Sequence, residues 1–521
     1  MTETQDISPL FQTADEQSEP IKAEVKGNLP SWLTGTMIRN GPGRFECGDT
    51  SFNHWFDGQG LLHSFHIQDG HVTYSSKFVR SESYADTKKR KNSIHLEFGS
   101  FIAPDPCQNI YDRFVSKFWM SEVPFDNAFD SVFTLKDRVF AAADSNIIFE
   151  IDPKTLDTLD KVDFAKEFPV KYLLLFLLVN IRFEGDAKIK FTTAHPQHTE
   201  DGSLINISVT HAKDSMYDII EIPASRTGKD EHPLEGGKLI CSIPPTNGVG
   251  YIHSFCITEN YIVVPEAPLV LNLWEAYVHR LKESGVVDWF QWIENERGRF
   301  HVVDRKKGTH VGIFTADPFF TFHQVNAFER DGNIYVDTCC FHDHTIIKQT
   351  YLHNMRSTII PGVKKLDIPD IRRYELPLKD LGDVKYGKPL ERGPDGLDYT
   401  ILHAGVEFPI INDTEKNGKP YNFFYGVGAD DQKWFSHLVK VNTETKEYIT
   451  WGEPGGFASE PVFVKAPDGK DEDDGVVLSC VINIPEETTY LLVLDGKEFK
   501  ELGRGVVKGI TPMSFHTGFF K

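Results

Sequence analysis

Four histidines of this 521-residue chain lie in similar local contexts and could together bind a metal ion. His195 lies in TTAHPQHTEDGSLINIS, His253 in YIHSFCITENYIVV, His323 in FTFHQVNAFERDGNIYVD and His516 in SFHTGFF. The first three each precede a polar turn that is followed by a run of β-forming residues. If these runs are the innermost strands of successive sheets, the imidazoles converge on one axis and offer nitrogen donors to a divalent metal. Because the chain has 20 histidines, packed or solvated side chains are the competing interpretation.

Asp-Gly pairs followed by alternating β-formers recur from one end of the chain to the other. They are Asp69–Gly70, Asp201–Gly202, Asp331–Gly332, Asp474–Gly475 and Asp495–Gly496. Asp-Gly tolerates the positive φ of tight hairpin turns, so each pair predicts strand, turn and strand. Helical patterns are few, at residues 108–119 and 271–282. We therefore predict an all-β closed fold with inserted helices, and a single domain over residues 1–521.

Composition excludes several classes of protein. The net charge is −21 and no basic block is present, so nucleic acid is not an expected partner. The 7 cysteines are scattered without CxxC spacing, which argues against a disulfide framework and favours a reducing compartment. The 39 phenylalanines indicate a Phe-rich core or, alternatively, an aromatic-lined cavity for an extended apolar ligand.

The N-terminus carries no targeting signal that we recognise. Residues 1–20 are acidic and polar, and they fit neither a signal peptide nor an Arg-rich transit peptide, so we expect a disordered tail there. The longest apolar run, residues 173–179, is far shorter than the about 20 residues that span a bilayer. We expect a soluble, cytoplasmic protein.

Several longer motifs occur in a specific order along the chain. They are LTGTMIRNGPG (33–43), FNHWFDGQGLLHSF (52–65), FGSFIAPDPCQNIY (98–111), TAHP (193–196), YIHSF (251–255), FHQVNAFE (322–329), EFP (407–409), SEPVFV (459–464), DEDDGVVLS (471–479) and FHTGFF (515–520). Together they resemble the animal carotenoid oxygenase family over essentially the whole chain.

The resemblance implies a seven-bladed β-propeller with Fe²⁺ on its axis and a helical and loop cap that shapes an apolar tunnel. The family's iron ligands fall on His195, His253, His323 and His516, and its three acidic positions beside them fall on Asp144, Glu407 and Glu460. Animal members usually carry glutamate where this chain has Asp144. The shorter side chain leads us to expect one histidine that is held through water or less firmly oriented.

The resemblance also implies an activity, which is cleavage of a conjugated C=C bond of a carotenoid or apocarotenoid by O₂ to carbonyl products. Stretches such as NLW (272–274) and RFHVVD (299–304) look closer to the β-carotene 9′,10′-oxygenase branch, so we favour eccentric cleavage. The alternatives are central 15,15′ cleavage to retinal, the non-oxidative retinoid isomerohydrolase reaction, and a catalytically impaired carotenoid-binding protein.

A helix predicted at residues 108–119 has two interpretations. In the family this segment lies near the membrane surface where substrate enters, which would give peripheral membrane contact through its aromatic face. The residues concerned are Cys107, Ile110, Tyr111, Phe114 and Phe118. A stripe at helical spacing is more often core, and Cys107 is more simply a packed cysteine than a lipidation site. Some relatives are mitochondrial, but this N-terminus gives no support for that location.

One stretch departs from the family. Residues 173–190, LLLFLLVNIRFEGDAKIK, are additional between FPVKY and TTAHP. They are either a looped-out insertion or an artefact of the gene model such as a retained intron. An apolar run there would disturb the strand that leads to His195, which makes this histidine the least secure of the four.

Overall fold

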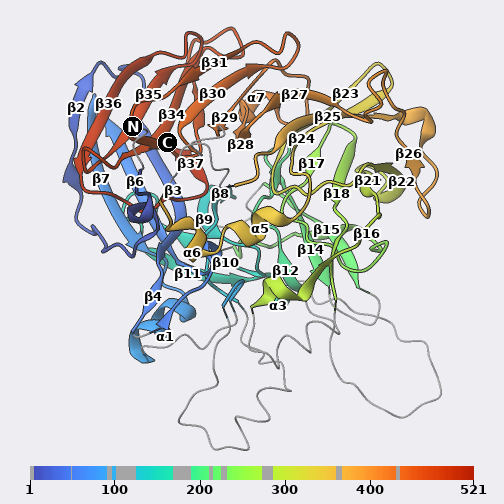
Figure 1. The fold of residues 1–521 in the computed structure, drawn as a ribbon, viewed down its shortest axis with the longest axis horizontal. Coiled ribbons are helices and arrows are strands. Elements are labelled where there is room, and N and C mark those ends of the chain that lie inside the picture. The colour runs from blue at the N-terminus through green and yellow to red at the C-terminus, as the bar shows by residue number, and fades with distance from the viewer. Residues whose placement is uncertain are drawn as a thin grey trace, which may run out of the picture.

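The structure is a computed structural model that describes residues 5–48, 50–90, 97–100, 125–167, 189–210, 215–224, 231–272, 285–358, 366–429 and 435–521. Strands dominate these residues, and helices are short and few. Seven sheets of four to six strands are arranged around a common centre (Figure 1). The fold is therefore the seven-bladed β-propeller that the resemblance implied.

Three sheets come mainly from the N-terminal half of the chain, and all of their pairings are antiparallel. The first contains β1 (Ile21–Lys22), β7 (His71–Phe78), β6 (Gln59–Gln68), β3 (Gly35–Arg44) and β37 (Thr517–Phe520). The second contains β8 (Ser131–Leu135), β9 (Arg138–Ala142), β10 (Ile147–Ile151) and β11 (Thr158–Asp163). The third contains β12 (Ile189–Thr192), β13 (Gln197–His198), β14 (Leu204–Thr210), β15 (Met216–Ile222) and β16 (Lys238–Ile243).

Four further sheets complete the ring, and two short pairs lie outside it. The fourth sheet contains β17 (Cys256–Ile257), β18 (Tyr261–Glu266), β21 (Gly298–Asp304), β22 (Thr309–Ala316) and β26 (Lys388–Pro389), and the fifth contains β23 (Gln324–Arg330), β24 (Asn333–Cys340), β25 (Asp370–Pro377) and β27 (Thr400–Ala404). The sixth contains β28 (Val406–Ile410), β29 (Phe423–Gly428), β30 (His437–Asn442) and β31 (Tyr448–Trp451). The seventh contains β2 (Glu24–Gly27), β36 (Glu501–Lys508), β35 (Thr488–Asp495), β34 (Gly475–Asn483), β32 (Gly456–Ala458) and β33 (Val462–Lys465). The pairs are β4 (Glu46–Cys47) with β5 (Thr50–Ser51) and β19 (Leu269–Leu271) with β20 (Phe290–Trp292).

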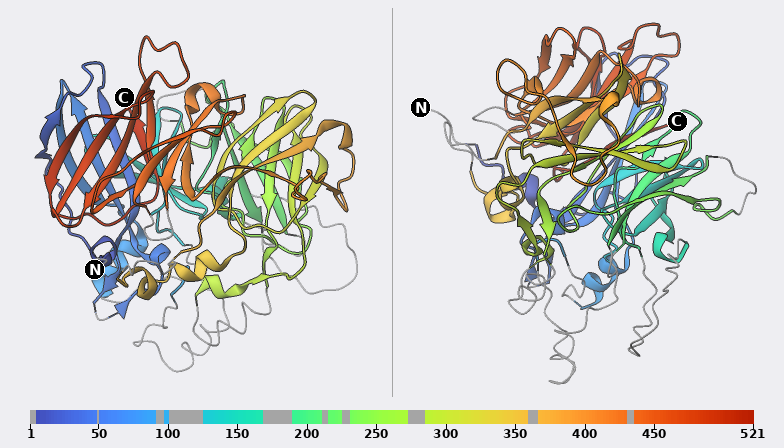
Figure 2. Two further views of the ribbon diagram at one scale, coloured as in Figure 1. Left: turned by 45° about the horizontal axis from the view of Figure 1, so that its top comes forward. Right: turned by 90° about the vertical axis from the view of Figure 1, so that its right-hand side faces the viewer.

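The two ends of the chain close the ring by exchanging strands. The C-terminal β37 pairs with β3, with Arg39 opposite Thr517 and Thr36 opposite Phe520. The N-terminal β2 pairs in turn with β36 of the last sheet. Figures 1 and 2 show the blue N-terminal strands beside the red C-terminal strands for this reason.

The predicted Asp-Gly turns are confirmed at some positions and wrong at others. Asp69 and Asp331 have φ of 52° and 51°, and each joins two paired strands through a tight turn. Asp495–Gly496 does not form such a turn, because the turn to β36 is longer and its left-handed residue is Phe499, with φ of 55°. Gly475 likewise opens β34 instead of closing a tight hairpin.

A cap of short helices and loops covers one end of the ring. The 3-10 helix η2 (Trp55–Asp57) lies against α5 (Thr345–Gln349) and α6 (Leu352–Met355). The backbone N–H of Trp55 donates to Thr350, directly after α5, and that of Leu352 donates to Asn53, shortly before η2. Phe56 of η2 places its ring 5.3 Å from that of Phe515, next to His516. The remaining elements are η1 (Ser8–Phe11), η3 (Val286–Trp289), η4 (Leu378–Asp380), α1 (Glu82–Arg90), α3 (Phe164–Glu167) and α7 (Asp413–Lys416).

The expected disordered tail at residues 1–20 is wrong for residues 5–20, which the structure describes. Ile7, Leu10 and Phe11 are buried at 0%, 1% and 0% exposure in the largest core cluster. Phe11 packs edge-on against Trp55, with ring centroids 5.4 Å apart. These three apolar side chains are spaced so that one turn of η1 buries them together, although the surrounding sequence is polar.

Some predictions lie outside the described residues. They concern Cys107, Ile110, Tyr111, Phe114 and Phe118 in the predicted helix 108–119, residues 273–282 of the other predicted helix, and residues 173–188 of the additional segment. Within the described ranges, no helix is long and apolar enough to cross a membrane. The cysteines whose side chains are described, Cys241, Cys256, Cys339, Cys340 and Cys480, are free and buried.

Candidate metal centre

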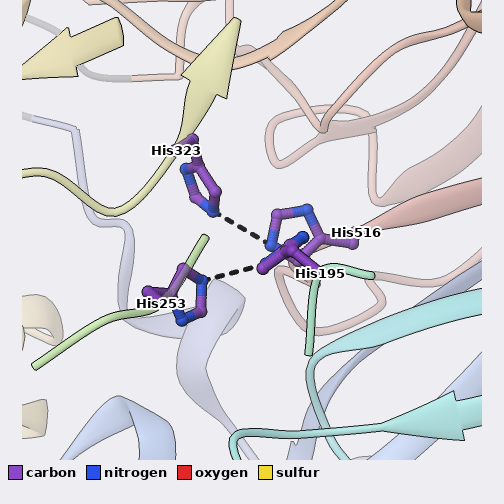
Figure 3. Close-up of side chains that lie close together, drawn as sticks. All are labelled: His195, His253, His323 and His516. Atoms are coloured by element: carbon purple, nitrogen blue, oxygen red, sulfur yellow. Dashed lines mark hydrogen bonds between the residues drawn. The ribbon is translucent and has the colours of Figure 1, made fainter. Parts of the chain in front are cut away.

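The four predicted histidines stand near the start of inner strands in four different sheets. His323 directly precedes β23 and His516 directly precedes β37, while His195 lies between β12 and β13 and His253 shortly before β17. The inner strands lie beside one another around the centre, β17 beside β23 and β37 beside β8. Residues at these positions therefore converge from distant parts of the chain, and Figure 3 shows the four rings pointing toward one another.

The ring nitrogens have the spacing of ligands around one ion. One nitrogen from each histidine lies within 4.8 Å of the others. Nε2 of His195 is 2.9 Å from Nε2 of His253, and Nε2 of His323 is 3.2 Å from Nε2 of His516. Two nitrogens bound at right angles to a divalent metal at about 2.1 Å lie about 3 Å apart. The donor spacing fits a first-row metal ion.

A carboxylate lies against the outer nitrogen of three of the rings. Nδ1 of His253 is 2.7 Å from Oδ2 of Asp144, Nδ1 of His323 is 2.6 Å from Oε2 of Glu407, and Nδ1 of His516 is 2.8 Å from Oε1 of Glu460. A ring N–H donated to a carboxylate fixes the tautomer and the ring orientation. The lone pair of Nε2 then faces the centre, as a metal ligand requires.

The expectation that Asp144 leaves its histidine held through water is wrong. Asp144 reaches His253 directly, because the turn between β9 and β10 brings its backbone close to the ring. Its Oδ1 accepts the backbone N–H of Ala194 at 3.0 Å, and its Oδ2 also accepts the hydroxyl of Tyr251 at 3.1 Å. The same side chain therefore fixes the backbone beside His195.

A backbone irregularity turns Glu407 toward the centre. The register of β28 against β29 shifts between Glu407 and Ile410, and Phe408 has φ of 52°. The N–H of Phe408 donates to Oε2 of Glu407. Strand bulges re-aim side chains in this way, and left-handed non-glycine residues gather at functional sites.

Burial sets the protonation of the histidines. Burial, reinforced by His516 and His253, lowers the pKa of His195 well below its usual value. Burial and the neighbouring His323 also lower the pKa of His516. Burial acts in the same direction on His253, but Asp144 and other nearby carboxylates outweigh it and raise the pKa of His253 to about 9.

A fourth carboxylate, which the sequence analysis did not single out, faces the same centre. Oδ2 of Asp130 is 3.6 Å from Nε2 of His195 and 3.8 Å from Nε2 of His253, and Oδ1 is 3.6 Å from Nε2 of His516. Burial, with the charge of Asp144, raises the pKa of Asp130 to about 7, although His253 acts the other way. One signal could have identified Asp130: it directly precedes β8, as His323 precedes β23.

The donor set suits a divalent cation. Imidazole nitrogens are ligands of iron, copper, nickel and zinc, and carboxylates hold metal-ligating imidazoles in place. Burial, reinforced by Asp130 and Glu407, raises the pKa of Glu460 well above its usual value, although the N–H of Thr517 opposes the shift. Buried carboxylates are stabilised by a nearby positive charge, which a cation between the four rings would provide.

Aromatic side chains border the centre. The ring of Phe322 is 5.6 Å from that of His253, and the ring of Phe408 is 5.2 Å from that of His323. Phe56 bridges from the cap to Phe322, at 6.0 Å, and to Phe515. Part of the high phenylalanine content therefore forms an apolar border around polar ligands.

Comparison with known proteins gives matches over nearly the whole chain. The family described as retinal pigment epithelial membrane protein matches residues 10–521. A protein of Mustela putorius furo named mitochondrial carotenoid-cleaving dioxygenase is 36% identical over 98% of this chain and 96% of its own length. A protein of Gallus gallus named beta,beta-carotene 15,15′-dioxygenase is 35% identical over 97% of this chain and 96% of its own length.

Solved structures agree on the fold. A mutant of the Synechocystis apocarotenoid oxygenase superposes with a TM-score of 0.77 at 22% identity, covering 98% of this chain and 97% of that one. A cobalt-substituted form of the Synechocystis protein gives 0.76 at 22% identity, covering 99% and 98%. With the family match over residues 10–521 and two relatives above 30% identity, the chain belongs to the retinal pigment epithelial membrane protein family of carotenoid oxygenases.

Proposed function

We propose that this chain is an Fe²⁺-dependent dioxygenase that cleaves one conjugated C=C bond of a carotenoid or apocarotenoid. The observation that carries the proposal is the convergence of His195, His253, His323 and His516 with their nitrogens within 4.8 Å. The names of the relatives from Mustela putorius furo and Gallus gallus support a carotenoid as substrate. O₂ is the second substrate.

The residues have distinct tasks in this reaction. A ferrous ion held by four neutral imidazoles would supply O₂ activation. Asp144, Glu407 and Glu460 keep three of the rings oriented, which the distances of 2.6–2.8 Å to their Nδ1 atoms support. Phe56, Phe322 and other aromatic rings bind the polyene and exclude water. Addition of both oxygen atoms across C=C gives two carbonyl groups and transfers no proton, so no general acid or base is required.

We propose eccentric 9′,10′ cleavage in preference to central 15,15′ cleavage. Product analysis after incubation with β-carotene separates the two reactions. Eccentric cleavage gives a short ketone and a long aldehyde, whereas central cleavage gives retinal alone. The same assay with a retinyl ester tests the isomerohydrolase reaction, which would give retinol without label from labelled O₂.

Metal analysis and histidine substitution test the proposal together. We expect about one iron per chain in the purified protein, and loss of both iron and turnover in His253→Ala and His323→Ala. His198→Gln is the matched control, because the Nε2–H of His198 donates to the carbonyl of Thr134 at 2.8 Å and the ring lies outside the cluster. Iron and turnover that survive His253→Ala and His323→Ala would overturn the proposal.

We also propose peripheral membrane contact through residues 107–118, from the apolar stripe of Cys107, Ile110, Tyr111, Phe114 and Phe118. Flotation with phosphatidylcholine vesicles tests it, with Phe114→Glu and Phe118→Glu expected to abolish co-flotation. Fractionation of cells separates a cytoplasmic from a mitochondrial location.

A further inference from the structure

We propose that Asp130 is a fifth protein ligand of the metal centre and binds on the side opposite His323. This inference rests on the proposed function, since it takes the four histidines as metal ligands. It adds a carboxylate to a set of donors that would otherwise be all nitrogen. Three observations carry it: the position of Asp130 in its sheet, the direction of its carboxylate, and the surroundings of its oxygen atoms.

Asp130 holds the same place in its sheet as two of the histidines hold in theirs. It is the residue directly before β8, as His323 is directly before β23 and His516 directly before β37. Strand β8 lies beside β37, and the backbone N–H of His516 donates to the carbonyl of Asp130 at 3.4 Å. The sheet of β8 to β11 therefore contributes an inner residue to the centre, and that residue is an aspartate.

The carboxylate of Asp130 points at the inner nitrogens of the rings. Its oxygens lie 3.6 Å, 3.8 Å and 3.6 Å from the Nε2 atoms of His195, His253 and His516. Among the described ion pairs, His323 is the ring of the four that makes none with Asp130. In a six-coordinate arrangement, a ligand close to three others and far from the fourth lies opposite that fourth ligand.

The surroundings of Asp130 are those of a ligand and not of a structural carboxylate. Asp130 is 6% exposed, and its buried Oδ2 has no hydrogen-bond partner. Asp57 shows the contrast, because it is also buried and its oxygens accept from Gly99 at 2.7 Å, Ser100 at 2.6 Å and the backbone of His54 at 2.9 Å. An unpartnered buried carboxylate oxygen costs free energy unless a cation binds it.

A carboxylate ligand would change the centre in two ways. It cancels one positive charge of the ion, which strengthens metal binding and favours the ferric over the ferrous state. It would also fill space beside the ion that four histidines alone would leave to small ligands.

Cobalt titration of the metal-free full-length protein tests the inference without any enzymatic turnover. The variants are Asp130→Asn, which keeps the shape of the side chain, and Asp130→Ala. The control is Asp398→Asn, because Asp398 is also buried, also has one oxygen without a hydrogen-bond partner, and pairs with Arg297 instead of a histidine. The readouts are the Co²⁺ dissociation constant, measured against a competing chelator, and the visible spectrum of bound Co²⁺.

We expect both Asp130 variants to bind Co²⁺ at least about tenfold more weakly and with a changed spectrum, while the control matches the unaltered protein. Affinity and spectrum that stay unchanged in Asp130→Asn would overturn the role of Asp130. If Asp130→Ala does not fold, Asp130→Asn alone decides. Failure of the proposed function looks different, because then the unaltered protein would bind no Co²⁺ or His253→Ala would bind it equally well.

Discussion

Asp144 joins two of the four histidines, because its carboxylate lies 2.7 Å from Nδ1 of His253 and accepts the backbone N–H of Ala194, next to His195. The contact to Ala194 positions His195 through the chain itself. A single aspartate thus fixes one ring directly and a second one through its backbone.

Replacing Asp144 should therefore loosen the centre without unfolding the propeller. We expect Asp144→Ala to weaken metal binding by about 10- to 100-fold, the range found when a partner of a metal-bound histidine is removed. Metal content after dialysis against graded chelator measures this. Asp152→Ala, in the turn after β10, is the control and should retain the affinity of the unaltered protein. Equal metal affinity in Asp144→Ala would contradict the positioning role.

Metal binding should release a proton from His253. Its pKa is raised from 6.5 to about 9, so the ring of the metal-free protein carries a second proton at neutral pH. A metal can bind Nε2 only after that proton leaves, so affinity should rise with pH up to about 9 and then level off. The raised pKa of His253 also means that its protonated ring stabilises the metal-free fold. This stabilisation is fully present below pH 6.5 and is lost as pH rises through about 9, so it falls with pH while metal affinity rises.

Calorimetric titration at pH 7.5 in two buffers with different ionisation enthalpies measures the released proton. We expect a buffer-dependent heat that corresponds to about one proton, and a smaller value for Asp144→Ala, which lacks the main charge that raises the pKa. Identical heats in the two buffers would show that His253 is already neutral.

Phe11 should be part of the folded core. It is 0% exposed and packs against Trp55, so Phe11→Ala should lower the free energy of unfolding by about 3–5 kcal/mol. Chemical denaturation with tryptophan fluorescence measures the change. Leu159→Ala is the control, because Leu159 is 58% exposed and its loss should cost less than about 0.5 kcal/mol. If Phe11→Ala lowers the free energy of unfolding as little as Leu159→Ala does, Phe11 is not part of the folded core.

Phe56 should contact the substrate and should not be needed for metal binding. Its ring links the cap to Phe322 and Phe515, each next to a histidine in the sequence. We expect Phe56→Ala to lower kcat/KM for the carotenoid by about tenfold or more, the size of a lost apolar contact, while iron content is unchanged. Loss of iron in this variant would instead place Phe56 in support of the centre.

Much of the site could be predicted because its residues carry local signals. The β run after each of His195, His253 and His323 placed these rings at strand starts, and the motif resemblance selected them from the 20 histidines. The reach of Asp144 was not predictable, since it depends on where the turn between β9 and β10 places the backbone. Asp130 was missed because an aspartate before a β run is usual at turns.

The fold too was predictable where local sequence decides it and not where distant residues do. The class of fold followed from the recurring Asp-Gly turns, and Asp69 and Asp331 behave as local sequence predicts. Asp495–Gly496 does not, because the backbone N–H of Gly496 donates to the carbonyl of Gly475, a partner 21 positions earlier in the chain. Burial of Ile7, Leu10 and Phe11 likewise depends on a surface built by residues far along the chain.

The strand that closes the propeller, β37, begins directly after His516 and pairs with β3. Closure of the ring and completion of the histidine cluster are therefore one structural event, because the pairing of β37 with β3 also brings the imidazole of His516 to the other three rings. A substitution that weakens this strand pairing would loosen the metal centre together with the fold.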